Sequence, residues 1–186
     1  PGRRLGPWVA GWGSLDSLQE RKALDNIPPL MGTSVNNSVS LPRDFYINPE
    51  VFEAEKNKIF RKEWLAVARS EDLAAAGDYL TYDVLGDEVI VTRDEQGGVQ
   101  AFSNVCLHRG CPIVSGHGHA ASRLLACPYH SWVYQLDGQL RGAPQMDRAE
   151  QFQANTMRLP AVAVEEWQGW VFINLDVDAT ALGPRL

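Results

Sequence analysis

Every cysteine and every histidine of the chain falls within residues 104–132, NVCLHRGCPIVSGHGHAASRLLACPYHSW. Cys106 and His108 form a C-x-H motif. After eighteen intervening residues, Cys127 and His130 form a C-x-x-H motif. Each motif places two side chains around one tight turn, where both can reach the same metal atom or cluster. The fold must therefore bring two such turns together, and two neighbouring hairpins can do this by holding a cofactor from opposite sides.

Two kinds of site suit two thiolates and two imidazoles. One is a closed tetrahedral zinc site, which is structural. The other is a [2Fe–2S] cluster in which two histidines replace two cysteines on one iron. In that cluster two thiolates neutralise the oxidised core, so the added electron meets less negative charge than at a four-thiolate site. The reduction potential is then raised, to about -150 to +300 mV. The spacing alone leaves both sites open.

The chain from residue 64 onward has the pattern of short antiparallel strands. Segments rich in aromatic and β-branched residues are separated by turn residues. Asp94 to Gly98 is expected to form a hairpin loop, and Asp137-Gly138 a tight turn. The expected fold is all-β, with antiparallel sheets stacked as a sandwich or small barrel. The expected strands lie in YLTYDVL, EVIVTRD, VQAFSNV, RLLACPY, SWVYQLD and GWVFINLD.

A helix is expected before the sheets, over residues 48–62. Asn48 can cap it, and Pro49 suits the first helical position. Phe52 and Ile59, seven residues apart, are expected on its apolar face, which Val51 and Phe60 widen. Residues 1–40, which are rich in Gly, Pro, Ser and Asn, are expected to form an extended arm.

Composition excludes several classes of protein. The net charge is -6, so there is no basic surplus to neutralise the phosphates of a nucleic acid. No apolar run approaches the length of a membrane span. An odd number of cysteines, three, does not make a disulfide framework. We therefore expect a cytoplasmic protein in a reducing compartment.

The segments CLHRG and CPYHSWVYQLDGQL resemble the Rieske [2Fe–2S] signature, in the form found in the α-subunits of Rieske non-haem iron oxygenases. The resemblance covers roughly residues 41–176 and includes the late WQGWVFINLD. It implies a Rieske-type fold of stacked antiparallel sheets, with the cluster held by two hairpin loops. The implied division is a helical lead-in at 41–63, a Rieske domain at 64–176, and the start of a linker at 177–186.

The resemblance also assigns the cluster ligands. Cys106 and Cys127 would bind one iron, and His108 and His130 the other. Flanking residues then become candidates for supporting the cluster from outside the ligand shell, through hydrogen bonds or packing. These candidates are Arg109, Gly110, Tyr129, Ser131, Trp132 and Pro144.

The implied function is one-electron transfer. A reductase or ferredoxin would supply the electrons, and a mononuclear Fe(II) of the two-His, one-carboxylate type would receive them. That iron would belong to a catalytic domain absent from this chain, in a neighbouring subunit of a trimer. It would activate O₂ to hydroxylate an organic substrate, which the aromatic-ring hydroxylases of the family suggest is aromatic. The alternatives are a stand-alone Rieske-type ferredoxin and a zinc-stabilised interaction module.

Three cysteine and histidine side chains, Cys111, His117 and His119, are not assigned as cluster ligands. In respiratory Rieske proteins a cysteine at the position of Cys111 forms a disulfide with one at the position of Tyr129, so Cys111 is expected to be unpaired, as a small buried residue. His117 and His119 are expected to be solvent-exposed and not to bind the cluster, because Gly116 and Gly118 indicate a flexible loop.

Gly110 is expected to adopt a positive φ or to let backbone N–H groups approach the cluster. Gly142 to Pro144 is either a loop covering the cluster or a surface turn.

Overall fold

The computed structural model describes residues 40–146, 149 and 151–185. The expected arm over residues 1–40 therefore lies, apart from Ser40, outside the described residues. The chain divides into two compact units, Pro1–Lys58 and Ile59–Leu186. The second unit contains both Cys/His motifs and all the strands of the described residues. Among the described residues, no helix has the length and apolar character needed to cross a membrane.

The helical segment begins as the sequence predicts. The Asn48 side chain accepts a hydrogen bond from the Glu50 N–H at 2.9 Å, and Pro49 occupies the first turn. The helix predicted over residues 48–62 is present, but it ends at Phe60 and changes type on the way. The α-helix α3 Pro49–Glu55 continues directly into the π-helical η3 Lys56–Phe60, and a separate short helix, α2 Asp44–Ile47, precedes them.

The expected apolar face of this helix is only partly confirmed. Val51 is buried and Phe60 half-buried, as expected, but Phe52 is 47% exposed and Ile59 48% exposed. A π-helix has more residues per turn than an α-helix, because its hydrogen bonds run from i to i+5. Two positions seven residues apart therefore no longer share one face once the chain enters η3.

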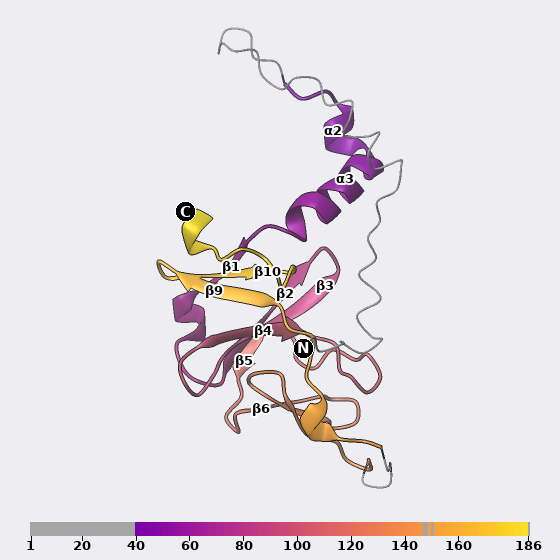
Figure 1. Cartoon of the computed structure of the whole chain (residues 1–186), viewed down its shortest axis with the longest axis vertical. Coiled ribbons are helices and arrows are strands. Elements are labelled where there is room, and N and C mark those ends of the chain that lie inside the picture. Colours follow the sequence, from indigo (N-terminus) through magenta and orange to yellow (C-terminus); the bar gives the residue numbers. More distant parts are fainter. Residues whose placement is uncertain (1–39, 147–148, 150, 186) are drawn as a thin grey trace, which may run out of the picture. The chain divides into compact units, whose positions relative to one another are not determined.

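The described residues of the second unit form three antiparallel sheets joined by turns and loops (Figure 1). The first has the order β1-β10-β9, the second β4-β3-β2-β5 and the third β6-β7-β8. The expectation of stacked antiparallel sheets preceded by a helix is confirmed. The strands are β1 Leu65–Arg69, β2 Asp78–Val84, β3 Asp87–Arg93, β4 Val99–Ser103, β5 His117–His119, β6 Leu124–Ala126, β7 Val133–Gln135, β8 Leu140–Gly142, β9 Ala163–Trp167 and β10 Trp170–Asn174. Short 3₁₀ turns lie at η4 Ser70–Leu73, η5 Ala154–Thr156 and η6 Gly183–Arg185.

The β4-β3-β2-β5 sheet lies between the other two, so β3 is buried on both faces. Val89 and Val91 pack in one apolar core with residues of β1 and β10. Ile90, which points to the opposite face, packs in a second core with residues of the third sheet. This explains why β3 has an unbroken apolar run and not an alternating one. The second core also contains both cysteines of the two motifs, so their loops are built on packed structure.

Both predicted turns are present. The Asp94 carboxylate accepts hydrogen bonds from the N–H groups of Gln96 and Gly98, at 2.9 and 2.7 Å, and so closes the β3–β4 loop. Gly138, in the β7–β8 turn, has a φ of 83°. A Cβ at Gly138 would come within 3.2 Å of the Phe102 ring, so glycine is favoured by the positive φ and by a tight contact.

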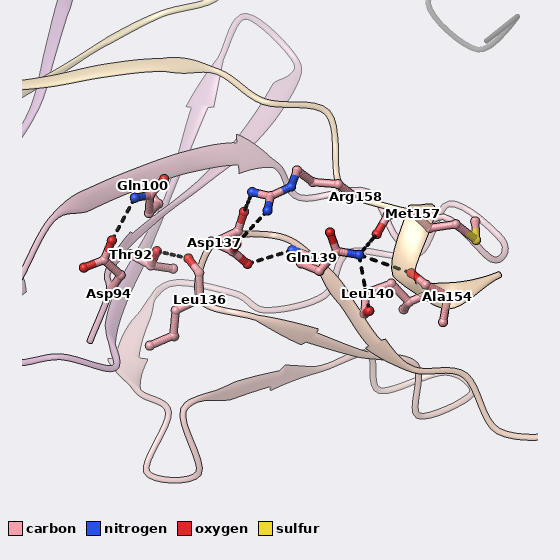
Figure 2. A network of polar contacts seen from close by, with 10 residues as sticks. All are labelled: Thr92, Asp94, Gln100, Leu136, Asp137, Gln139, Leu140, Ala154, Met157 and Arg158. Atoms are coloured by element: carbon pink, nitrogen blue, oxygen red, sulfur yellow. Dashed lines mark hydrogen bonds and ion pairs between the residues drawn. The ribbon is translucent and has the colours of Figure 1, made fainter. Parts of the chain in front are cut away.

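Figure 2 shows the polar contacts that hold the β7–β8 hairpin. Buried Thr92, on β3, donates its hydroxyl to the Leu136 carbonyl at 2.6 Å. On the other side, Gln139 Nε2 donates to the Met157 carbonyl at 2.7 Å. Arg158 binds the turn twice, to the Asp137 carbonyl and carboxylate, both at 2.7 Å. The hairpin that follows the second Cys/His motif is therefore fixed from two sides.

The expected flexible loop around His117 is wrong. His117–His119 form β5, an edge strand that pairs antiparallel with β2. Gly118 lies opposite Tyr79, and a Cβ at Gly118 would come within 2.5 Å of the tyrosine hydroxyl oxygen. The glycine is therefore explained by a close side-chain contact in a sheet and not by a flexible loop.

Candidate metal centre

The two Cys/His motifs lie in loops with the same backbone hydrogen bonds, residues 106–111 and 127–132. In each loop the fourth residue after the cysteine donates its N–H to the cysteine carbonyl, at 2.9 Å from Gly110 and 3.0 Å from Ser131. In each, the cysteine N–H donates to the carbonyl five residues later, at 2.9 and 2.8 Å. The two loops therefore have the same turn conformation, although the histidine follows the cysteine by two residues in one loop and by three in the other.

The residue that closes each turn has a left-handed backbone. The φ of Gly110 is 68°, which confirms the expected positive φ. The φ of Ser131 is 56°, in the region that side-chain-bearing residues disfavour. The two positions are structurally equivalent, and one of them carries a strained residue.

The two thiols are buried side by side. Cys106 and Cys127 are each 2% exposed. Burial raises the pKa of the Cys106 thiol. Burial also opposes ionisation of Cys127, but the backbone N–H groups of Tyr129 and His130, together with a hydrogen bond from Cys106, outweigh it and lower the pKa of Cys127. The second loop therefore presents N–H donors that favour a thiolate.

Tyr134, on β7, supports the first thiol, and the sequence reasoning missed this residue. Its hydroxyl accepts the Leu107 N–H at 3.0 Å and lies 3.2 Å from Cys106 Sγ. Burial raises the pKa of Tyr134 strongly, so the phenol stays protonated and can donate its proton to the sulfur. Strand alternation was the available signal, because Tyr134 lies two residues after Trp132 in a predicted strand.

The two imidazoles also pair. The ring centroids of His108 and His130 are 4.5 Å apart, with the planes at 71°. Buried Trp132 stacks on His108, with centroids 4.9 Å apart and planes at 7°. The pKa of His108 is lowered by burial first, then by the nearby His130 and Arg109. Its Nδ1 is buried with no hydrogen-bond partner, which leaves that nitrogen for a metal.

The flanking candidates divide between the core and the surface. Trp132 is in the core, where Phe152 packs edge-on against it at 5.5 Å. Tyr129 is 59% exposed and lies against His130 at 3.8 Å between ring centroids. Arg109 is exposed. Whether Tyr129, Ser131 or Arg109 tunes a cofactor stays a prediction.

The segment Gly142 to Pro144 ends in a surface turn, and its role as a loop covering the cluster stays a prediction. Ala143 packs against the core that contains the two cysteines. Pro144 is exposed in a turn closed by a hydrogen bond from the Met146 N–H to the Ala143 carbonyl, at 3.3 Å.

Cys111 is half-buried, not fully buried as expected, and has no disulfide partner, like the other two cysteines. Its thiol donates to the Pro112 carbonyl at 3.3 Å.

This donor set fits a binuclear cluster. Within the described residues, no three or more His, Cys, Asp or Glu side chains are arranged around one ion position. Instead the two sulfurs pair and the two imidazoles pair, as two irons with two ligands each require. The unpartnered Nδ1 of His108 and the N–H groups directed at Cys127 are further features that a negatively charged cluster would use.

The comparison with family models decides between the zinc and iron–sulfur readings. Residues 63–156 match the model of the Rieske [2Fe-2S] domain. The chain belongs to this family. The cofactor of a Rieske domain is a [2Fe–2S] cluster, and the site described above is where the chain would hold it.

The similar proteins are oxygenase subunits. The chain is 37% identical to the carnitine monooxygenase oxygenase subunit of Acinetobacter baumannii, over 88% of this chain and 44% of that protein. It is 41% identical to the glycine betaine monooxygenase oxygenase subunit of Chromohalobacter salexigens, over 73% of this chain and 30% of that protein. The chain thus spans less than half the length of these relatives.

Two solved structures illustrate the range of structural neighbours. The first is a quaternary ammonium Rieske monooxygenase whose description concerns carnitine oxidation and inter-subunit electron transfer. It has a TM-score of 0.74 and 39% identity, over 79% of this chain and 40% of that chain. The second is naphthalene 1,2-dioxygenase from Rhodococcus sp., with a TM-score of 0.73 and 28% identity, over 89% of this chain and 36% of that chain.

Proposed function

We propose that the chain carries single electrons through a [2Fe–2S] cluster bound by Cys106, Cys127, His108 and His130. The observation that carries the proposal is the pair of matching loops, which place two buried thiols together and bring two imidazole rings edge to face. When bound, the cluster supplies one-electron redox chemistry at a moderate potential, since two of its ligands are neutral. Tyr134 would donate a hydrogen bond to a ligand sulfur, and Trp132 would fix the plane of one imidazole.

The electrons would serve an oxygenase. The relatives named above are oxygenase subunits, and one neighbour's description includes inter-subunit electron transfer. We therefore propose that a reductase or ferredoxin reduces the cluster. The electron would then pass to a mononuclear non-haem iron in the catalytic part of the enzyme, in a neighbouring subunit of an oligomer.

The proposed substrate class is a quaternary ammonium compound, and this replaces the aromatic substrate expected from the sequence. The relatives named for carnitine and glycine betaine are 37% and 41% identical to the chain, whereas three naphthalene dioxygenase structures are 34%, 32% and 28% identical. The substrate contacts themselves would lie in the catalytic part, so this proposal rests on similarity.

The cluster is tested by spectroscopy of the purified protein. We expect a brown protein with about two irons per chain, and a rhombic electron paramagnetic resonance signal on reduction with dithionite. Cys127→Ser should remove the signal, whereas Cys111→Ser, the matched control, should retain it. A colourless protein that contains zinc would contradict the proposal.

The substrate class is tested in a single turnover, which needs no identified electron donor. The dithionite-reduced protein that carries this chain is mixed with O₂ and with carnitine, glycine betaine, choline or naphthalene. We expect oxidation of one quaternary ammonium compound and none of naphthalene. Oxidation of naphthalene alone would contradict the substrate class. Loss of the reduced signal with no substrate oxidised would instead favour the stand-alone electron carrier.

A further inference from the structure

His117 and His119 present their side chains on the same face of β5. Gly118, between them, is paired with Tyr79, whose ring occupies the space where a Cβ of Gly118 would be. Successive residues of a strand alternate between faces, so both histidines point away from that ring. Both are exposed, and β5 is the edge of its sheet. Two imidazoles at i and i+2 on an open edge can reach one ion.

One of the two rings is already oriented by a carboxylate. His119 Nδ1 lies 2.7 Å from Asp78 Oδ1, and these residues are direct partners in the β2–β5 ladder. The other oxygen of Asp78 accepts the Ala75 N–H at 2.7 Å, which holds the carboxylate in place. The bond to His119 is the first cause of the lowered pKa of Asp78. With Nδ1–H donated to Asp78, the lone pair of Nε2 is free to bind a metal.

We propose that His117 and His119 form a surface site for a divalent transition-metal ion, with Asp78 as the residue that positions His119. A carboxylate on the second ring nitrogen is the usual partner of a metal-binding histidine. Neutral imidazole suits Zn²⁺, Ni²⁺ and Cu²⁺ in preference to Mg²⁺ or Ca²⁺. The described residues offer only these two ligands, so water or a side chain of another molecule would complete the coordination. The site uses neither histidine of the cluster.

A nearby cation opposes the ion and limits its affinity. A Cβ at Gly77 would come within 2.6 Å of Arg123 Nη1 and 3.2 Å of His119 Cε1, so the guanidinium and the imidazole lie beside each other over this glycine. The positively charged guanidinium of Arg123 therefore repels a divalent ion bound to the neighbouring imidazole. Arg123→Met should therefore bind the ion more tightly than the unaltered protein does.

The test is calorimetric titration of Zn²⁺ into the oxidised protein with its cluster in place. We expect one ion per chain. His117→Ala and His119→Ala should each weaken binding by about tenfold or more, and Asp78→Asn by about 10- to 100-fold. Asp83→Asn changes a carboxylate on the same strand at the far end from β5, and should bind as the wild type does.

The visible spectrum, recorded during each titration, separates this site from the cluster. It should stay constant while Zn²⁺ binds. The proposal is overturned if the His117→Ala/His119→Ala double variant binds Zn²⁺ as tightly as the wild type. It is equally overturned if heat is released only as the cluster spectrum bleaches, because the ion would then be replacing iron.

Discussion

Among single residues, Tyr134 makes the clearest energetic contribution to the centre. Its hydroxyl lies 3.2 Å from Cys106 Sγ, and once Cys106 is bound as a thiolate only the O–H can donate. Such a bond stabilises the reduced cluster most, because the reduced cluster carries more negative charge. Tyr134→Phe should therefore lower the reduction potential. If the bond is worth about 1 kcal/mol more in the reduced state, the shift is roughly 40 mV. Voltammetry measures it, with the exposed Tyr82→Phe as control. An unchanged or higher potential in Tyr134→Phe would contradict the assigned direction of the bond.

The equivalent positions Gly110 and Ser131 make a paired prediction about stability. Both have a positive φ, which costs an L-residue about 1 to 2 kcal/mol. Ser131→Gly should therefore stabilise the protein by up to about 1 kcal/mol, because the glycine it introduces also loses more entropy on folding. Gly110→Ala should destabilise it by about 1 to 2 kcal/mol. Denaturant unfolding of the cluster-loaded proteins gives both values. Shifts of the same sign would show that the two loops do not share one conformation.

Among the elements, the β7–β8 hairpin combines a buried bond and an exposed ion pair. The Thr92 hydroxyl bonds the Leu136 carbonyl in the core, whereas Arg158 and Asp137 pair at the surface (Figure 2). Thr92→Val keeps the shape but removes the buried donor, so it should cost about 1 to 3 kcal/mol. Arg158→Met should cost about 1 kcal/mol or less, because solvent screens the pair. Thermal unfolding compares the two. A larger loss of stability in Arg158→Met than in Thr92→Val would show that the surface ion pair, and not the buried hydrogen bond, contributes more to the stability of this hairpin.

Element-level prediction succeeded where the determinants are local. Asn48 marks the helix start, and Asp94 and Gly138 mark hairpin turns, because each acts through its own backbone or that of near neighbours. It failed where a distant segment decides the structure. Gly118 indicates a flexible loop until Tyr79, on another strand, is known to lie across it.

The same distinction applies to the site. Cys106 and Cys127 could be selected from the sequence, because each shares a short motif with a histidine. Strand alternation places Tyr134 on the same face as Trp132, but the contact of Tyr134 with Cys106 spans 28 residues and does not follow from that pattern. The equivalence of the two loops was hidden as well, because it lies in backbone hydrogen bonds and not in residue identity.

On the scale of the whole second unit, a partly buried ion pair links two of the sheets. Arg93, on β3, is 9% exposed and binds Glu166, on β9, at 2.7 Å. The hydrogen bond from Arg93 is the first cause of the lowered pKa of Glu166. Because the folded-state pKa lies below the unfolded value of about 4.3, this stabilisation is complete above that pH and is lost as the pH falls through the folded value.

Acid unfolding tests this link. Glu166→Gln should be less stable than the wild type at pH 7, and the difference should shrink as the pH falls below about 4.3. Urea unfolding at a series of pH values measures the difference. A difference that is constant with pH would mean that the carboxylate charge contributes nothing.

The central claim is that His108 and His130, and not His117 and His119, bind the cluster. Electron–nuclear double resonance of the reduced protein, labelled with ¹⁵N only in histidine, tests it most directly. The account predicts two strongly coupled histidine nitrogens, and the same two couplings in the His117→Ala/His119→Ala variant. Loss of a coupling in that variant, or a cluster signal without any histidine coupling, would contradict it.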